Sequence, residues 1–164
     1  MLRFVTAVGV AGILLGCVGC GIDTDPAVFV DPNITGPKAT VVEGALGTSI
    51  QDGAFTLALH LGPRASGASS VGLGAFSIQG SDQKTTIVSP LDVASKQVFP
   101  VTVDVDSDVD VPFTFGTGTA PLDKGKLGEL CASAGIVVSG VIQDSLQNGA
   151  TPVFSPVFHA SGCP

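Results

Sequence analysis

The sequence contains no tryptophan or tyrosine, only one methionine, and few basic residues. Sugar binding by stacking normally relies on the faces of Trp or Tyr, so the absence of both argues against that mode of recognition. Seven Lys and Arg against fourteen Asp and Glu give a formal net charge of −7. Nucleic-acid binders need a basic surface, and a purely electrostatic hold on anionic lipids needs one too. Both functions are therefore excluded.

Recognisable catalytic motifs are also missing, since there is no GxSxG, no HExxH and no P-loop. His60 and His159 are the only histidines, and a zinc site usually needs three or four close ligands. Gly72-Leu73-Gly74 begins like a dinucleotide-binding loop, but Ser77 occupies the place of the third glycine. A hydrolase would have to assemble its site from scattered Ser, Asp and His. We therefore expect a protein that is not an enzyme and has no cofactor.

The N-terminus has the pattern of an export signal. Arg3 is followed by an apolar run from Phe4 to Leu15, which is about a dozen residues and too short for a bilayer core that needs roughly 20. A short charged start before a short apolar stretch is typical of a secretory signal peptide, predicted here over residues 1–16. The alternative is a buried first element of the fold. Cleavage would remove Arg3, leaving six basic residues against fourteen acidic ones, a net charge of −8.

The residues that follow narrow the type of signal. Leu14-Leu15-Gly16-Cys17 resembles the bacterial lipobox, with an aliphatic residue three before the cysteine and a small residue just before it. The resemblance implies that Cys17 is lipidated and becomes the first residue of the mature protein. Cys20 is the less favoured candidate, because Cys17 stands at its aliphatic position. Two or three acyl chains make a lasting anchor, so the expected partner is a membrane of the bacterial cell envelope.

The rest of the chain divides into a tether and one domain. Residues 17–37 are rich in Gly, Asp, Pro and Asn, and predict a flexible tether. From residue 38 to 164 the apolar residues alternate with polar ones, which predicts β-strands separated by turns. The expected strands cover residues 55–61, 71–78, 85–88, 101–105, 109–115, 136–142 and 153–158, and one short helix is expected over residues 122–132.

Four aspartates form the most prominent polar feature: Asp104, Asp106, Asp108 and Asp110. If residues 101–105 and 109–115 formed a hairpin closed at 106–108, all its apolar residues would share one face. Asp104 would then lie opposite Asp110, and like charges placed so are destabilising. Clustered carboxylates are ligands for Ca²⁺, so a calcium site is one hypothesis. A solvated acidic turn is the other.

The last two predicted strands suggest a disulfide. Asn148-Gly149 is a strong hairpin turn signal, and Cys131 and Cys163 lie at equal distances on either side of position 147. The hairpin would bring these cysteines together, and export permits their oxidation. Pro152 and Pro156 lack a backbone N–H, so the final strand should lie at an edge.

Taken together, these features resemble an all-β, antiparallel immunoglobulin-like sandwich over roughly residues 40–164. The core Trp of antibody domains and the Tyr of a tyrosine corner are absent. Phe55, Phe113 and Phe115 fall on the expected core face. The sequence predicts a non-enzymatic cell-envelope lipoprotein whose domain is an interaction or structural module for an unknown partner. The alternative is a calcium-dependent adhesion or ligand-binding domain.

Overall fold

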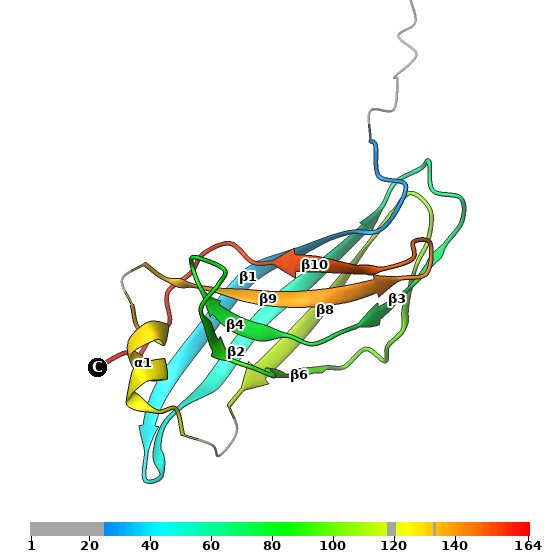
Figure 1. Cartoon of the computed structure of the whole chain (residues 1–164). Coiled ribbons are helices and arrows are strands. Elements are labelled where there is room, and N and C mark those ends of the chain that lie inside the picture. Colours follow the sequence, from blue (N-terminus) through cyan, green and yellow to red (C-terminus); the bar gives the residue numbers. More distant parts are fainter. Residues whose placement is uncertain (1–24, 118–120, 133) are drawn as a thin grey trace, which may run out of the picture.

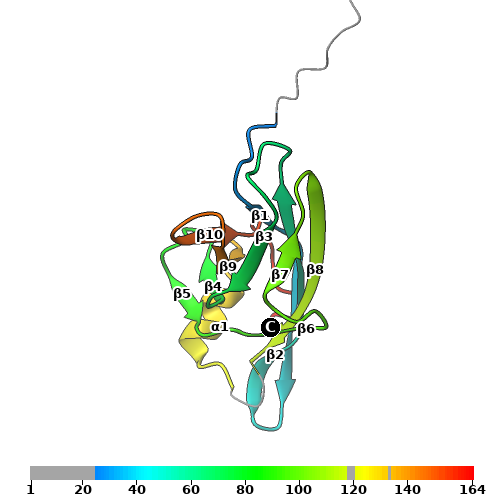
Figure 2. The same cartoon turned by 90° about the vertical axis from the view of Figure 1, so that its right-hand side faces the viewer.

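The domain is a sandwich of two β-sheets, which confirms the predicted immunoglobulin-like architecture (Figure 1; Figure 2). The computed structural model describes residues 25–117, 121–132 and 134–164. The first sheet has the order β1 (Asp31–Gly44), β2 (Gly47–Leu61), β8 (Ser107–Gly116) and β6 (Asp92–Ser95). The second has the order β5 (Thr86–Val88), β4 (Ser77–Gly80), β9 (Ile136–Asp144), β3 (Ser69–Leu73) and β7 (Val101–Val103), and β10 (Ala150–Phe154) also pairs with β9. Every strand pairing is antiparallel.

One short helix, α1 (Lys124–Leu130), connects β8 in the first sheet to β9 in the second, as predicted. Asp123 caps it, because its carboxylate accepts the backbone N–H of Lys126 at 2.8 Å. The helix lies at the end of the sandwich opposite the entry of the N-terminal segment, and the C-terminus lies beside it (Figure 1). The sandwich thus has an N-terminal end and a helix end.

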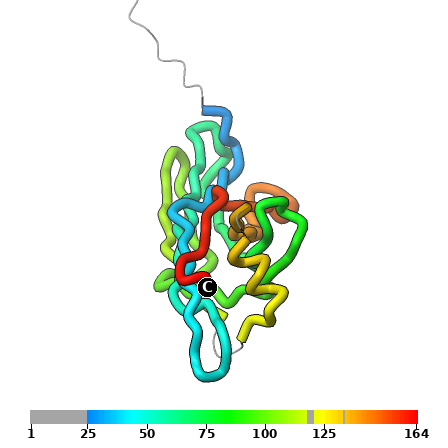
Figure 3. The backbone as a smooth tube through the Cα atoms, turned by 90° about the vertical axis from the view of Figure 1, so that its left-hand side faces the viewer, coloured from blue at the N-terminus to red at the C-terminus, as the bar shows by residue number. Residues whose placement is uncertain are grey.

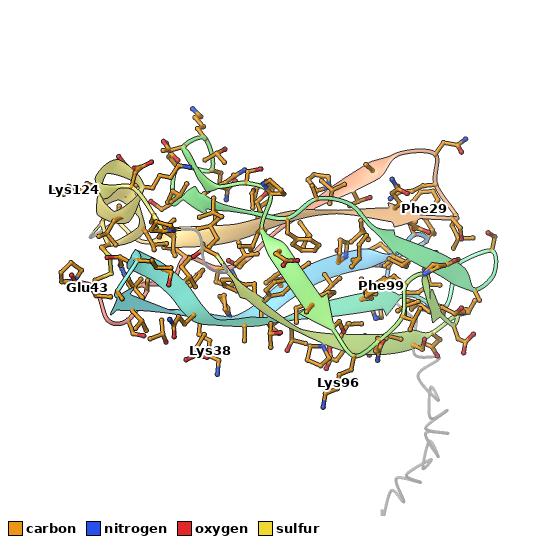
Figure 4. The ribbon with its side chains drawn as sticks, turned by 90° about the horizontal axis from the view of Figure 1, so that it is seen from below. Phe29, Lys38, Glu43, Lys96, Phe99 and Lys124 are labelled. Atoms are coloured by element: carbon orange, nitrogen blue, oxygen red, sulfur yellow. A yellow bond between two sulfur atoms is a disulfide. The ribbon has the colours of Figure 1, made fainter. Side chains whose placement is uncertain are left out.

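The core lies between the sheets and is filled by the alternating residues of the long strands. On β2 the inward residues Phe55, Leu57, Leu59 and Leu61 are all at most 2% exposed. Five phenylalanine rings meet at its centre with centroid separations of 5.1–6.0 Å: Phe55, Phe76, Phe99, Phe113 and Phe115. Figure 4 shows these layers of side chains, with the labelled Phe99 between the two sheets. The three predicted core phenylalanines are confirmed.

The C-terminal hairpin and its disulfide are confirmed as well. β10 pairs with β9, with Ala150 opposite Gln143, although the strand covers Ala150–Phe154 rather than residues 153–158, and Cys131 is joined to Cys163. The segment after β10 then runs beside β1 (Figure 3). There the Val41 N–H donates to the Ser161 carbonyl at 2.8 Å. This segment therefore ties the first sheet to the second at the helix end.

The predicted boundary between tether and domain is wrong. β1 begins at Asp31, inside the stretch assigned to the tether, and Ile34 is completely buried. A bulge between Thr35 and Lys38, formed by Gly36 with φ 59° and by Pro37, shifts the strand's inward face. The bulge interrupts the alternation and places the glycine and proline within the strand, so composition alone indicated a linker.

The predicted hairpin of residues 101–105 and 109–115 is also wrong. β7 pairs with β3 in one sheet, whereas β8 pairs with β2 and β6 in the other. The chain crosses between sheets at residues 104–106, where Asp106 has φ 57°. Both sheets turn their apolar faces to the same core, so alternation is satisfied equally by a hairpin and by a crossover. The crossover also avoids the unfavourable pairing of Asp104 with Asp110.

Two smaller differences concern the middle of the chain. Residues 71–78, expected as one strand, contain parts of β3 and β4 separated by Gly74–Phe76. Both strands pair with the same edge of β9, one after the other. β6 was not predicted, because its four residues carry only weak alternation. Neither difference changes the layers of the fold.

Candidate functional site

The N-terminal end of the sandwich carries a three-residue polar cluster centred on His60. Asp25 Oδ2 lies 2.6 Å from His60 Nε2, and Asp108 Oδ1 lies 2.8 Å from His60 Nδ1. His60 stands on the outer face of β2, directly opposite Asp108 on β8. Asp25 comes from the segment that precedes β1. The cluster therefore fastens this segment to two strands of the first sheet, and we call it the His60 clasp.

The clasp stabilises the charged form of each partner for which a shift is resolved. The hydrogen bond to Asp25, followed by that to Asp108, raises the pKa of His60 above its usual value of 6.5. The backbone N–H of Ala27, followed by the His60 ring, lowers the pKa of Asp25 below 3.8. Arg64 adds a smaller electrostatic contribution in the same direction. In the clasp the His60 ring lies between two carboxylates, which favour its protonated form.

A glycine makes room for this segment. A Cβ atom at Gly62 would lie 2.5 Å from the Ala27 carbonyl oxygen and 2.7 Å from Asp25 Oδ2. Such contacts are shorter than van der Waals distances, so any side chain at position 62 would displace the segment. The end of β2 thus provides both the histidine that binds the segment and the gap that accommodates it.

Five residues after Asp25, a buried carboxylate holds the chain a second time. Asp144, 3% exposed at the end of β9, accepts the Val30 N–H at 2.8 Å through Oδ2. Its other oxygen accepts the Ser69 hydroxyl and, at 2.8 Å, the Leu146 N–H. Asp144 therefore joins the start of β1 to β3 and to the β9–β10 turn, which belong to the other sheet. Sequence reasoning missed this residue, because an aspartate at the end of a strand resembles an ordinary turn residue.

The four aspartates predicted as a calcium site do not lie along one hairpin. Asp104 and Asp106 belong to the crossover, where the Asp104 carbonyl accepts the Ser107 hydroxyl at 2.6 Å. Asp108 belongs to the His60 clasp, and Asp110 stands opposite Ala58 in the sheet. Within residues 25–117, 121–132 and 134–164, no three His, Cys, Asp or Glu side chains form a metal-binding group. Calcium binding remains a prediction, but without the geometry on which it was based.

The second histidine lies far from the first. His159 is exposed and contacts the backbone region of Gly135, near the helix end. The two histidines therefore belong to opposite ends of the sandwich and cannot share a metal ion.

Two hollows of the described surface are wide open to solvent. One of about 600 Å³ lies on the first sheet, between Lys38, Asp52 and Asp92, over small residues. Figure 4 shows Lys38 pointing away from this sheet. Another, of about 720 Å³, lies beside the β9–β10 turn, and its lining includes Gln143, Gln147 and the carboxylate residue Asp144. Neither hollow gathers charged groups of one sign around an enclosed space.

The predicted signal peptide (residues 1–16), the lipidation candidate Cys17 and its alternative Cys20 lie outside the described residues. In the part of the chain that the structure describes, no helix is long and apolar enough to cross a membrane.

Sequence reasoning predicted neither the clasp nor the second attachment point. Asp25 lay in the presumed tether, 35 positions from His60, and no local pattern connects them. The available signal was His60 itself, an ionisable residue on the outer face of an otherwise regular strand. Its partners follow only from the register of β2 with β8 and from the path of the chain before β1.

Comparison with known proteins yields little. No protein family matches the chain, and no curated protein matches it. Among solved structures, the chain is similar to the "ASH / PapD-like domain of human CEP192 (PapD-like domain 7)", with 9% identity and a TM-score of 0.30. The alignment covers 95% of this chain and 100% of that one. At this identity and score, the likeness does not bear on what this chain binds.

Proposed function

We propose that this protein is a non-enzymatic lipoprotein of the bacterial cell envelope, anchored through Cys17. The observation that carries the proposal is the sequence Leu14-Leu15-Gly16-Cys17 directly after a short apolar leader. The β-sandwich would be the exported part, acting as an interaction or structural module.

The short distance between the anchor and the domain supports this arrangement. Eight positions separate Cys17 from Asp25, the first of the described residues, which the His60 clasp holds against the sandwich. Eight extended residues span at most about 29 Å. The domain would therefore stay close to the membrane, with its N-terminal end nearest the lipid.

The charge of that end indicates why a lipid would be needed. Its aspartates are Asp25, Asp31, Asp104, Asp106 and Asp108, and its nearby cationic groups are Arg64 and the His60 ring. An acidic surface is repelled by anionic lipid headgroups over about a Debye length. Attachment would thus come from buried acyl chains, each CH₂ contributing about 0.8 kcal/mol.

The described histidines support a non-catalytic role. Both ring nitrogens of His60 are hydrogen-bonded to carboxylates, so neither is available to activate a serine or a water. His159 is exposed at the other end of the sandwich. A nucleophile of the described domain would therefore lack an imidazole base at the N-terminal end, where polar groups are most concentrated.

Intact mass spectrometry of the full chain, produced in a bacterium and extracted in detergent, tests the anchor. We expect loss of residues 1–16 and a mass gain that corresponds to a diacylglyceryl group and an amide-linked acyl chain on Cys17. Cys17→Ala should leave an uncut, unlipidated chain. Cys20→Ala is the matched control and should be processed normally. An unmodified Cys17, or lipid carried by Cys20, would contradict the proposal.

Two further measurements test the module. Crosslinking in intact cells should recover a discrete envelope partner with the anchored chain and much less of it with Cys17→Ala, if position at the membrane matters. Incubation of the purified lipidated chain with envelope polymers should give no turnover. Turnover that is lost on substitution of a serine or aspartate of the domain would refute the non-enzymatic assignment.

A further inference from the structure

The segment that leads into β1 is held against the sandwich at two points of different chemistry. At Asp25 it is held through ionisable side chains, by the His60 clasp. At Val30 it is held through a backbone N–H, in a buried bond to Asp144, and the Val30 side chain is itself 3% exposed. Between these points, Val28 and Phe29 are 42% and 44% exposed. The apolar side chains between the two points are therefore partly exposed, and neither belongs to the buried core.

The geometry of the clasp favours a protonated ring. A neutral imidazole has one N–H and one lone pair, whereas the imidazolium ion has two N–H donors. Here both ring nitrogens lie within 2.8 Å of carboxylate oxygens, which are acceptors when ionised. A neutral ring could donate to only one of Asp25 and Asp108, and its lone pair would face the other carboxylate.

The surrounding charges favour the same state. On β1, Asp31 stands opposite His60, and on β8 Asp108 stands on its other side. Asp110 lies two residues further along β8, also on the outer face. Arg64, after β2, is the described cation that acts on Asp25. The ring thus lies in a mainly acidic surface, and Asp25 and Asp108 are the two carboxylates that favour its protonated form.

We propose that the proton on His60 controls whether residues 25–29 lie against the sandwich or swing free about Val30. Below the titration of His60 the clasp is closed and the segment is ordered. Above it the clasp opens, while the bond from Val30 to Asp144 keeps the start of β1 in place.

The released segment would lengthen the connection to the membrane. Five freed residues add up to roughly 17 Å of reach, which is a large addition to an eight-residue link. This consequence rests on the proposed lipid anchor, whereas the clasp itself does not. The proton on His60 would then set how far the domain can move from its anchor.

Nuclear magnetic resonance of the full chain in detergent micelles can test the clasp, whether or not Cys17 is lipidated. The chain has two histidines, so His159→Ala leaves the ring signals of His60 alone and serves as the matched control. Backbone order parameters of Ala27, Val28 and Phe29 are then followed from about pH 5 to about pH 9. We expect them to fall from about 0.85 to below about 0.6 with the same midpoint as the His60 ring signals. Val30 should stay rigid throughout.

Two variants remove the clasp in different ways. His60→Ala should leave residues 27–29 mobile at every pH, with an unchanged β-sheet spectrum. Asp25→Asn keeps the shape and the acceptor for Ala27 but removes the charge, so the segment should be mobile already at lower pH. The proposal is overturned if order at 27–29 is independent of pH while His60 titrates, or if Val30 loosens together with them. If the chain carries no lipid but the order of residues 27–29 still depends on pH, the result would refute only the proposed anchor.

Discussion

Replacement of Asp144 is the most direct test of how the N-terminal end is held together. Asp144→Ala removes the acceptor of three donors: the Val30 N–H, the Ser69 hydroxyl and the Leu146 N–H. Val30 and Ser69 are 3% and 0% exposed, so water cannot easily replace the lost bonds. A buried donor left without a partner costs about 1–3 kcal/mol. Two such donors predict a loss of about 2–6 kcal/mol, a large share of the roughly 5–15 kcal/mol that stabilises a domain.

Asp144→Asn should cause only part of this loss of stability. An amide retains one oxygen, which can still accept the Ser69 hydroxyl and the Leu146 N–H. Its NH₂ group would face the Val30 N–H, so that bond is lost and a loss of about 1–2 kcal/mol is expected. The matched control is Asp110→Ala, because Asp110 is exposed on β8 and should change stability by less than about 0.5 kcal/mol.

Urea unfolding followed by far-ultraviolet circular dichroism provides the measurement, since the chain has no tryptophan to report by fluorescence. With a slope of about 2 kcal/mol per molar urea, a loss of about 2–6 kcal/mol should lower the unfolding midpoint of the alanine variant by roughly 1–3 M. The expected order of destabilisation is Asp144→Ala, then Asp144→Asn, then Asp110→Ala. If the first variant matches the control, burial of the Asp144 charge costs as much as its hydrogen bonds contribute, and our account of this residue is incorrect.

Three other predictions concern the disulfide, pH and calcium. Joint replacement of Cys131 and Cys163 by alanine should cost roughly 3–4 kcal/mol in urea unfolding, because the bond closes a loop with a sequence separation of 32. The raised pKa of His60 means that its contribution to stability is complete below 6.5 and is lost as pH rises through its higher folded value. The lowered pKa of Asp25 means that its contribution is complete above 3.8 and is lost as pH falls through its lower folded value. Melting temperatures should therefore be highest between these limits, and a maximum outside them would contradict the clasp. Melts with calcium and with a chelator should coincide, because residues 104–110 spread their carboxylates over a crossover and a sheet face; a higher midpoint with calcium would restore the calcium hypothesis.

Alternation predicted the parts of the fold in which neighbours along the chain are also neighbours in space. The inward residues of β2 and β8 were identified correctly, and Phe55 and Phe113 stack at 5.1 Å. The β9–β10 hairpin and the bond from Cys131 to Cys163 followed from one turn signal and symmetric spacing. In each case an alternation with a period of two, or a local turn signal, was sufficient to predict the structure.

The wrong predictions concern segments whose strand partners are distant in the sequence. The segment with Ile34 is a strand only because it pairs with residues around Leu57 on β2, across a bulge that conceals its period. The segment around the aspartates from 104 to 110 suggested a hairpin. Apolar residues that face the core do not reveal to which of the two sheets their strand belongs. The His60 clasp could not be predicted without both corrections, because the path of β1 places Asp25 and the register of β8 places Asp108.

The arrangement of β1 is well suited to a domain held by its N-terminus. A pull on Asp25 reaches first the His60 clasp, which is partly exposed and depends on charge, and then the buried bond between Val30 and Asp144. Beyond Val30 the load passes along the ladder that β1 forms with β2, from Asp31 to Gly44. At the far end Val41 is bonded to Ser161. The attachments thus run from partly exposed, charged groups at the surface to buried hydrogen bonds in the sandwich, and the proposed release of residues 25–29 involves only the outermost one.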